Sequence, residues 1–107
     1  MTGFRVWRGD APGPGEVAAR FDRWGLTPRS WGNPPGDTYD WHDHHIHKVL
    51  YCVRGSITFH RRDGDDVELH PGDRLDIEPG TSHAATVGPG GVHCVEASAS
   101  ASPGGLP

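Results

Sequence analysis

The chain has 107 residues, which is enough for one domain with a single hydrophobic core but not for two. Acidic residues outnumber basic ones by 14 to 10, and the formal net charge of −4 at pH 7 argues against general binding of nucleic acid. No apolar run approaches the roughly 18 residues of a membrane-spanning helix, and the N-terminus lacks the apolar core of a signal peptide. We therefore expect a soluble, cytoplasmic domain that contacts neither nucleic acid nor membranes.

Residues 1–36 are expected to form an extension that packs on the main domain. The sequence predicts a short strand at Phe4–Trp7, a helix at Glu16–Leu26 and an edge strand at Arg29–Trp31. The helix prediction depends on Val17, Phe21 and Trp24, which are spaced to form one apolar stripe.

The most informative stretch begins with four histidines between His42 and His47 and continues into an apolar run, Val49–Val53. The run is typical of a buried strand, and Gly55 is expected to open a turn after it. If the strand extends back through the histidines, its period of two puts one set of side chains on the inner face: His42, His44, Ile46, Lys48, Leu50 and Cys52. Two imidazoles at i and i+2 can aim at one point, as metal binding requires.

His45 and His47 have the opposite parity in that strand, so we expect them to be exposed or at an interface. A register error of one residue would reverse this and make His45 and His47 the converging pair. The remaining chain predicts further strands at Ser56–Arg61, around Val67 and Leu69, around Leu75 and Ile77, at His83–Val87 and at Val92–Ala97. Such regular short strands with few helices indicate a sandwich or barrel, and the segment 98–107 is expected to be a disordered tail.

Two segments of the chain resemble the paired motifs of the cupin superfamily. The first motif is H-x-H, three or four residues, Glu, six residues, Gly. His42, His44 and Gly55 match it, but Lys48 stands at the position of the glutamate.

The second motif is P-G, five residues, P-x-G, two residues, His, three residues, Asn. The matching residues are Pro71-Gly72, Gly80 and His83, whereas Glu78 replaces the inner proline and Val87 stands at the asparagine position.

The resemblance implies an all-β fold, a double-stranded β-helix of the cupin or jelly-roll type. The apolar stripe described above adds one short N-terminal helix to it. It assigns the barrel core to residues 37–97 and suggests a homodimer with a pocket lined by the motif residues. It also implies a divalent metal, one of Fe, Zn, Ni, Mn or Cu, with His42, His44 and His83 as ligands. The fourth ligand of the family does not carry over.

Lys48 is an unusual neighbour for a cation, because a unit charge about 4 Å from another is worth roughly 4 kcal/mol at an effective dielectric of about 20. Three arrangements would avoid the repulsion. Lys48 could be neutral, it could turn away from the metal, or an anionic ligand such as a carboxylate could bridge the metal and the ammonium. We adopt the third as a hypothesis, which predicts a small anionic organic ligand.

These residues lead to competing functions. The first is a small metal-dependent enzyme in which Lys48 or a tyrosine such as Tyr39 moves protons. Dioxygenation is its leading reaction class, because a three-histidine iron site resembles that of thiol dioxygenases, and isomerase or lyase chemistry is equally possible physically. The second is a non-catalytic module that binds a metal or a small molecule, and the third a dimerisation domain with a vestigial pocket. Two further alternatives stay open: a metal-free pocket that uses Lys48, and a bulge at Ile46 that brings His47 into the fourth ligand position.

Overall fold

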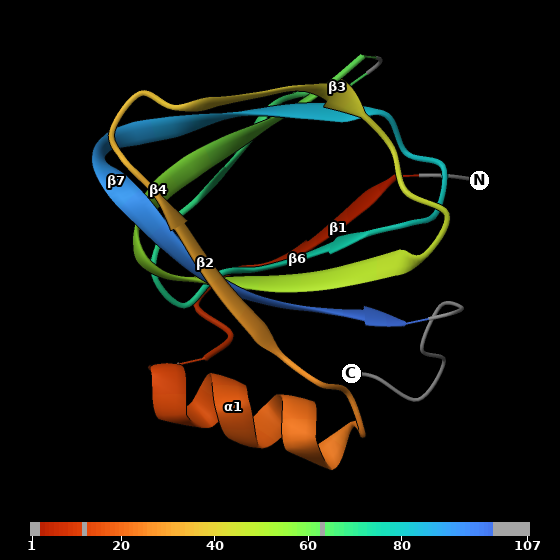
Figure 1. Cartoon of the computed structure of the whole chain (residues 1–107), viewed down its shortest axis with the longest axis vertical. Coiled ribbons are helices and arrows are strands. Elements are labelled where there is room, and N and C mark those ends of the chain that lie inside the picture. Colours follow the sequence, from red (N-terminus) through yellow and green to blue (C-terminus); the bar gives the residue numbers. More distant parts are fainter. Residues whose placement is uncertain (1–2, 12, 63, 100–107) are drawn as a thin grey trace.

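The computed structural model describes residues 3–11, 13–62 and 64–99. These residues form a β-barrel with one helix on its outside, which confirms the predicted all-β fold (Figure 1). The elements are β1 (Phe4–Trp7), α1 (Pro14–Arg23), β2 (Arg29–Asn33), β3 (Thr38–His42), β4 (His47–Arg61), β5 (Val67–Leu69), β6 (Arg74–Ile77) and β7 (His83–Ala99). Within the described ranges, no helix is both long and apolar enough to cross a membrane.

Two long strands, β4 and β7, form the middle of the barrel and pair with each other from His47↔Ala99 to Arg61↔His83. All strand pairs are antiparallel: β6 lies on the other side of β4, β1 beyond β6, and both β2 and β3 pair with β7 (Figure 1). The predicted turn at Gly55 is wrong, because Gly55 is a bulge with φ +74° inside the continuous strand β4.

The prediction of two separate strands at His83–Val87 and Val92–Ala97 is also wrong, since β7 continues through the residues between them and Gly91 adopts φ +77°. Positive φ values are open to glycine without a steric penalty, so each glycine bends its strand without ending it. At the end of β7, Ser98 and Ala99 pair with β4, and the rest of the expected tail, residues 100–107, lies outside the described residues.

The alternation of side chains along β4 separates two hydrophobic clusters. Leu50 and Cys52 point into the barrel and join the larger cluster, as the period of two predicts. Val49 and Tyr51 point to the outer face, where Val17 and Phe21 of α1 cover them. The helix ends at Arg23, three residues before the predicted end. After it, Gly25 adopts φ +71° and its amide donates to the carbonyl of Asp22.

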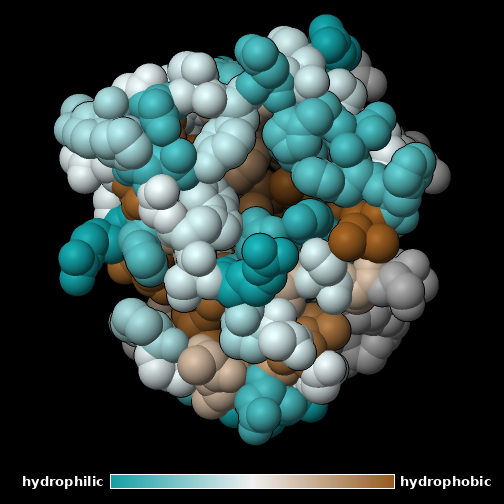
Figure 2. Space-filling view, in the orientation of Figure 1, coloured by the Kyte–Doolittle hydropathy of each residue, from teal (hydrophilic) through white to brown (hydrophobic). Residues whose placement is uncertain are grey.

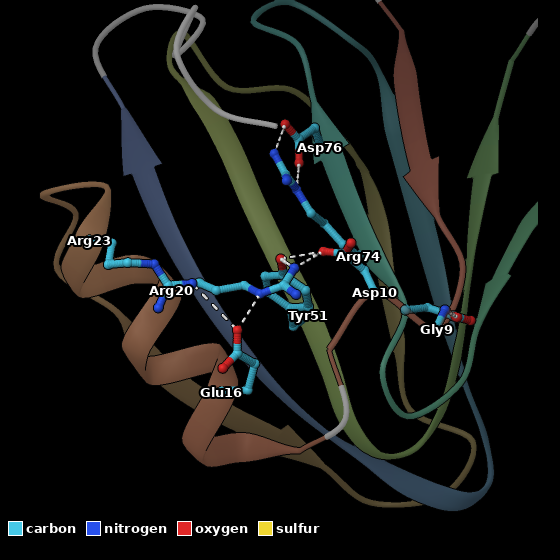
Figure 3. A network of polar contacts seen from close by, with 9 residues as sticks. Gly9, Asp10, Glu16, Arg20, Arg23, Tyr51, Arg74 and Asp76 are labelled. Carbon is cyan, nitrogen blue, oxygen red and sulfur yellow. Dashed lines mark hydrogen bonds and ion pairs between the residues drawn. The ribbon is translucent and has the colours of Figure 1, made fainter.

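A polar network ties α1 to the outer face of β4 (Figure 3). The hydroxyl of Tyr51 donates to Asp10 at 2.7 Å, and the guanidinium of Arg20 donates to Asp10, Tyr51 and Glu16. Burial, and then the hydrogen bond to Asp10, raise the pKa of Tyr51, which keeps the hydroxyl protonated as a donor. The extension before β2 is therefore attached to the barrel by both apolar and polar contacts.

His47 is buried, with 1% of its surface exposed, so the prediction of an exposed or interface histidine is wrong for this residue. Its Nε2 lies 3.1 Å from a carboxylate oxygen of Asp76, and both oxygens of Asp76 accept hydrogen bonds from the buried Arg74. His47 does face away from the inner side of the barrel, as its parity predicts. His45 is exposed, as predicted.

Asp73 joins the N-terminal segment to the turn before β6, and we expect its replacement by asparagine to destabilise the fold. Its carboxylate accepts hydrogen bonds from the amides of Gly9 and His70 and from the side chain of Arg8. Burial acts to raise the pKa of Asp73, but these bonds outweigh it and leave the pKa below its usual value. We expect Asp73→Asn to lower the free energy of unfolding by about 2–3 kcal/mol, because hydrogen bonds to a charged group are worth about 1.5–3 kcal/mol.

The pH dependence of stability identifies the origin of this loss. A carboxylate with a lowered pKa stabilises the fold above the pKa of the unfolded chain, and this stabilisation disappears as the pH falls through the folded pKa. Urea unfolding from pH 7 downward should therefore show the wild-type and Asp73→Asn stabilities converging in acid. Asp22→Asn, at an exposed helix position, is the control and should change stability by no more than about 0.5 kcal/mol. A constant difference at all pH values would contradict this account.

Candidate metal centre

Three histidines from two parts of the chain converge on one point. His42 ends β3, His44 follows it in the connection to β4, and His83 begins β7 directly opposite His42. The ring centroids of His42 and His83 are 4.3 Å apart, those of His42 and His44 are 4.9 Å apart, and those of His44 and His83 are 5.5 Å apart. One nitrogen of each ring lies within 4.8 Å of the others, so the three side chains could hold one metal ion.

Hydrogen bonds fix the tautomers of two of these rings. Nδ1 of His83 lies 2.8 Å from the carbonyl oxygen of Thr81, and Nδ1 of His42 lies 2.7 Å from that of Asp40. Because a carbonyl oxygen only accepts, each Nδ1 must carry the proton, which leaves Nε2 with a free lone pair. This arrangement is the one by which proteins orient histidine ligands toward a metal.

The protonation states also suit metal binding. Burial lowers the pKa of His83, and burial followed by the positive charge of Lys48 lowers the pKa of His44. Metal ligation requires the neutral imidazole. The donor set therefore fits a divalent transition metal.

The three rings line a cavity of about 240 Å³ inside the barrel. The other lining residues are the apolar Leu50, Phe59, Ile77 and Ala85, the aromatic Trp31 and Tyr39, and the charged Lys48 and Glu96. In the space-filling view, a hollow is visible with hydrophobic residues at its floor and hydrophilic residues around it (Figure 2). A cavity with apolar walls and a few converging polar groups is typical of a site for a small molecule.

Lys48 lies in this cavity and has a partner that the sequence pattern does not predict. Its ammonium donates to one carboxylate oxygen of Glu96 at 2.8 Å, and the indole N–H of Trp31 donates to the other oxygen at 2.8 Å. Glu96 is on β7, opposite Leu50 of β4. The structure thus provides the lysine with a carboxylate from the protein itself.

Tyr39 lines the mouth of the cavity, and 37% of its surface is exposed. Its hydroxyl donates to the side-chain carbonyl of Asn33, and its ring packs edge-on against Trp31 with centroids 5.9 Å apart. The structure therefore brings all five candidate residues around one cavity: His42, His44, His83, Lys48 and Tyr39. His47 does not line it, and its Nε2 is held by Asp76.

Residues 31–97 match the family described as the cupin domain, Cupin_2. No curated protein matches the chain. Among solved structures, the chain is 29% identical to one described as DMSP lyases RdDddP and RnDddQII, with a TM-score of 0.58. That match covers 68% of this chain and 36% of the other, so the chain spans about a third of the length of that relative.

Two further structures cover similar parts of the chain. An uncharacterized conserved protein with a double-stranded β-helix domain from Klebsiella pneumoniae is 26% identical, with a TM-score of 0.61, over 77% of this chain and 70% of that one. An RmlC-like cupin from Shewanella frigidimarina is 25% identical, with a TM-score of 0.61, over 71% of this chain and 67% of that one. These likenesses agree with the barrel and with the family match, which extends over more than half of the sequence: the chain belongs to the cupin family.

Proposed function

We propose that this cupin binds one divalent transition-metal ion through His42, His44 and His83 and acts on a small organic acid bound in the adjoining cavity. The observation that carries the proposal is the convergence of three imidazoles, two of them with Nε2 left free by a bond at Nδ1. The likeness to a structure described as DMSP lyases supports lyase chemistry as the reaction class.

A metal bound there would supply a Lewis acid for an oxygen of the substrate. The side chains of Leu50, Phe59 and Ile77 would exclude water from the apolar part of the ligand. The ammonium of Lys48 has three protons, one of which goes to Glu96, so two remain available to a substrate carboxylate. Tyr39 is the candidate for moving a proton at the mouth of the cavity, once its hydroxyl leaves Asn33.

A non-catalytic binding module is the second candidate, and one observation favours it. Both groups that we expect to move protons are engaged within the protein, Lys48 with Glu96 and Tyr39 with Asn33. Dioxygenation is a further alternative within the first candidate, since a three-histidine iron site resembles that of thiol dioxygenases. The identity of the metal would distinguish oxygen chemistry from Lewis-acid chemistry.

The test is the metal content of protein made without a metal-affinity tag. We expect about one equivalent of a transition metal in the wild type and almost none in His42→Ala or His83→Ala, since each variant removes one of only three protein ligands. His45→Ala is the matched control, because His45 belongs to the same segment but is exposed and outside the cavity. Absence of metal in the wild type after reloading with Fe, Zn, Ni, Mn and Cu would refute the metal proposal.

Binding of small carboxylates to the loaded protein, measured by calorimetry, tests the ligand class. The wild type should bind them more tightly than Lys48→Met does, whereas neutral analogues should bind both proteins equally. The homodimer and the division into an extension at 1–36 and a barrel at 37–97 are also proposals, and light scattering of the purified protein measures the first of them.

A further inference from the structure

The two cysteines of the chain lie directly opposite each other in the middle of the barrel. Cys52 of β4 and Cys94 of β7 are register partners, both are free thiols, and neither has any exposed surface. Both belong to the inner hydrophobic cluster. The pair is separate from the three histidines and does not line the cavity.

The backbone hydrogen bonds show which kind of antiparallel pair this is. The amide of Cys52 donates to the carbonyl of Asp73, and the carbonyl of Cys52 accepts from the amide of Gly72. Both backbone groups of Cys52 therefore point away from β7, so Cys52 and Cys94 form a non-hydrogen-bonded pair. In such a pair the Cα atoms are about 4.5 Å apart, which lies within the range of about 4.4–6.8 Å that a disulfide spans.

The thiols also interact with each other. The neighbouring thiol lowers the pKa of Cys52, whereas the neighbouring thiol and burial raise that of Cys94, so Cys52 is the thiol that ionises first. The sulfur of Cys52 lies 3.6 Å from the carbonyl oxygens of Arg54 and Gly55, at the bulge of β4. The ladder with β7 is irregular between Cys52 and Arg54, where β4 bulges.

We propose that Cys52 and Cys94 form a reversible cross-strand disulfide when the protein meets a peroxide. Cys52 gives up its proton, and its thiolate attacks one oxygen of hydrogen peroxide. The O–O bond breaks, a sulfenic acid forms, and the leaving hydroxide takes up the proton to become one water. The thiol of Cys94 then attacks that sulfur, the S–S bond forms, and a second water leaves. The two thiols are oxidised and one peroxide is reduced to two waters. A thiol reductant reverses the reaction by exchange.

Oxidation would act on the cavity above the pair. Glu96 lies two residues after Cys94 on β7, and Leu50 lies two residues before Cys52 on β4. Both Glu96 and Leu50 line the cavity. Trp31, which donates to Glu96, is the β2 partner of Cys94. A bond between the sulfurs would therefore join covalently the two strands that carry the Lys48–Glu96 pair.

Intact mass spectrometry of the full-length, chelator-treated protein tests the proposal without depending on the metal site. Treated with peroxide and then with N-ethylmaleimide under denaturing conditions, the wild type should lose about 2 Da and take up no maleimide. If the peroxide-treated protein is reduced with dithiothreitol before N-ethylmaleimide is added, it should carry two maleimide adducts. The result that overturns the proposal is wild-type protein that keeps two reactive thiols, or that gains about 16 or 32 Da without the loss of 2 Da.

Two sets of variants complete the experiment. Cys52→Ser and Cys94→Ser should each show at most a gain of oxygen, and never the loss of 2 Da. The double variant with both serines shows the mass gain from oxidation at Met1, the one methionine of the chain. That mass gain is subtracted from the wild-type spectrum. The wild-type mass alone decides the proposal if a variant fails to fold.

Discussion

Replacing Gly55 with alanine should destabilise the protein by about 2–5 kcal/mol, because two separate penalties add. Gly55 has φ +74°, a conformation that costs a residue with a Cβ about 1–2 kcal/mol. A Cβ at this position would also lie 2.0 Å from the carbonyl oxygen of Gly91 and 2.8 Å from its carbonyl carbon. These are backbone atoms of the adjacent long strand, so they have little freedom to move aside, and overpacking of this kind costs about 1–3 kcal/mol.

Two other glycines separate these penalties. Gly36 has φ +79°, but a Cβ added there would meet nothing within 4 Å, so Gly36→Ala should show the conformational cost alone, about 1–2 kcal/mol. Gly90 has neither a positive φ nor a close neighbour, and Gly90→Ala should be nearly neutral. Urea unfolding followed by circular dichroism measures all three. If Gly55→Ala costs no more than Gly36→Ala, β7 yields at Gly91 and the clash is not part of the effect.

The same glycine shows why the sequence predicts positions of strands better than their number. A glycine between two apolar runs is compatible with a turn or with a bulge, since both need positive φ. The pairing that decides between them comes from the other long strand, more than twenty residues away. The sequence therefore predicts four strands where the structure has two long bent ones.

Burial on the outer face was a second limit of the sequence. The period of two correctly places Lys48, Leu50 and Cys52 on the inner side and His47 on the other. Side chains on the outer face of a strand are exposed to solvent only when nothing covers that face. Here α1 covers the outer face of β4 around Tyr51. His47, on the same face, is also buried, and its Nε2 lies 3.1 Å from a carboxylate oxygen of Asp76 on β6, a residue that the linear pattern does not connect with it.

The sequence likewise predicts one part of the candidate site and misses another. Motif spacing brings His42, His44 and His83 together, although the connection between β3 and β4 is not a strand. His83 comes from β7, the strand that pairs with β3. Glu96 was missed because an acidic residue in an alternating strand usually faces solvent. Its partner Lys48 is 48 positions away. The one available signal was that Glu96 shares its parity with Cys94, an inner residue.

The pair of Lys48 and Glu96 leads to a second large effect, on the affinity for the metal. Both charges reach the histidines: apart from burial, Lys48 acts to lower the pKa of His44 and Glu96 acts to raise it. Glu96→Gln leaves the ammonium without its counter-charge and should weaken metal binding roughly ten- to a hundredfold, since one unit charge near a divalent cation is worth a few kcal/mol at an effective dielectric of about 20. Lys48→Met leaves a free carboxylate and should strengthen binding.

A double-mutant cycle makes this prediction specific. The variant with both substitutions has an uncharged cavity wall, as the neutralised pair does, and should bind the metal with nearly wild-type affinity. Affinities are measured by competition with a chromophoric chelator, and Glu68→Gln, an exposed acid outside the cavity, is the control for the change in net charge. If Glu96→Gln binds as tightly as the wild type, the ammonium does not act on the metal. If Lys48→Met weakens binding, Lys48 takes part in holding the ion in some other way, and the ion pair is not the device that keeps a lysine beside a cation.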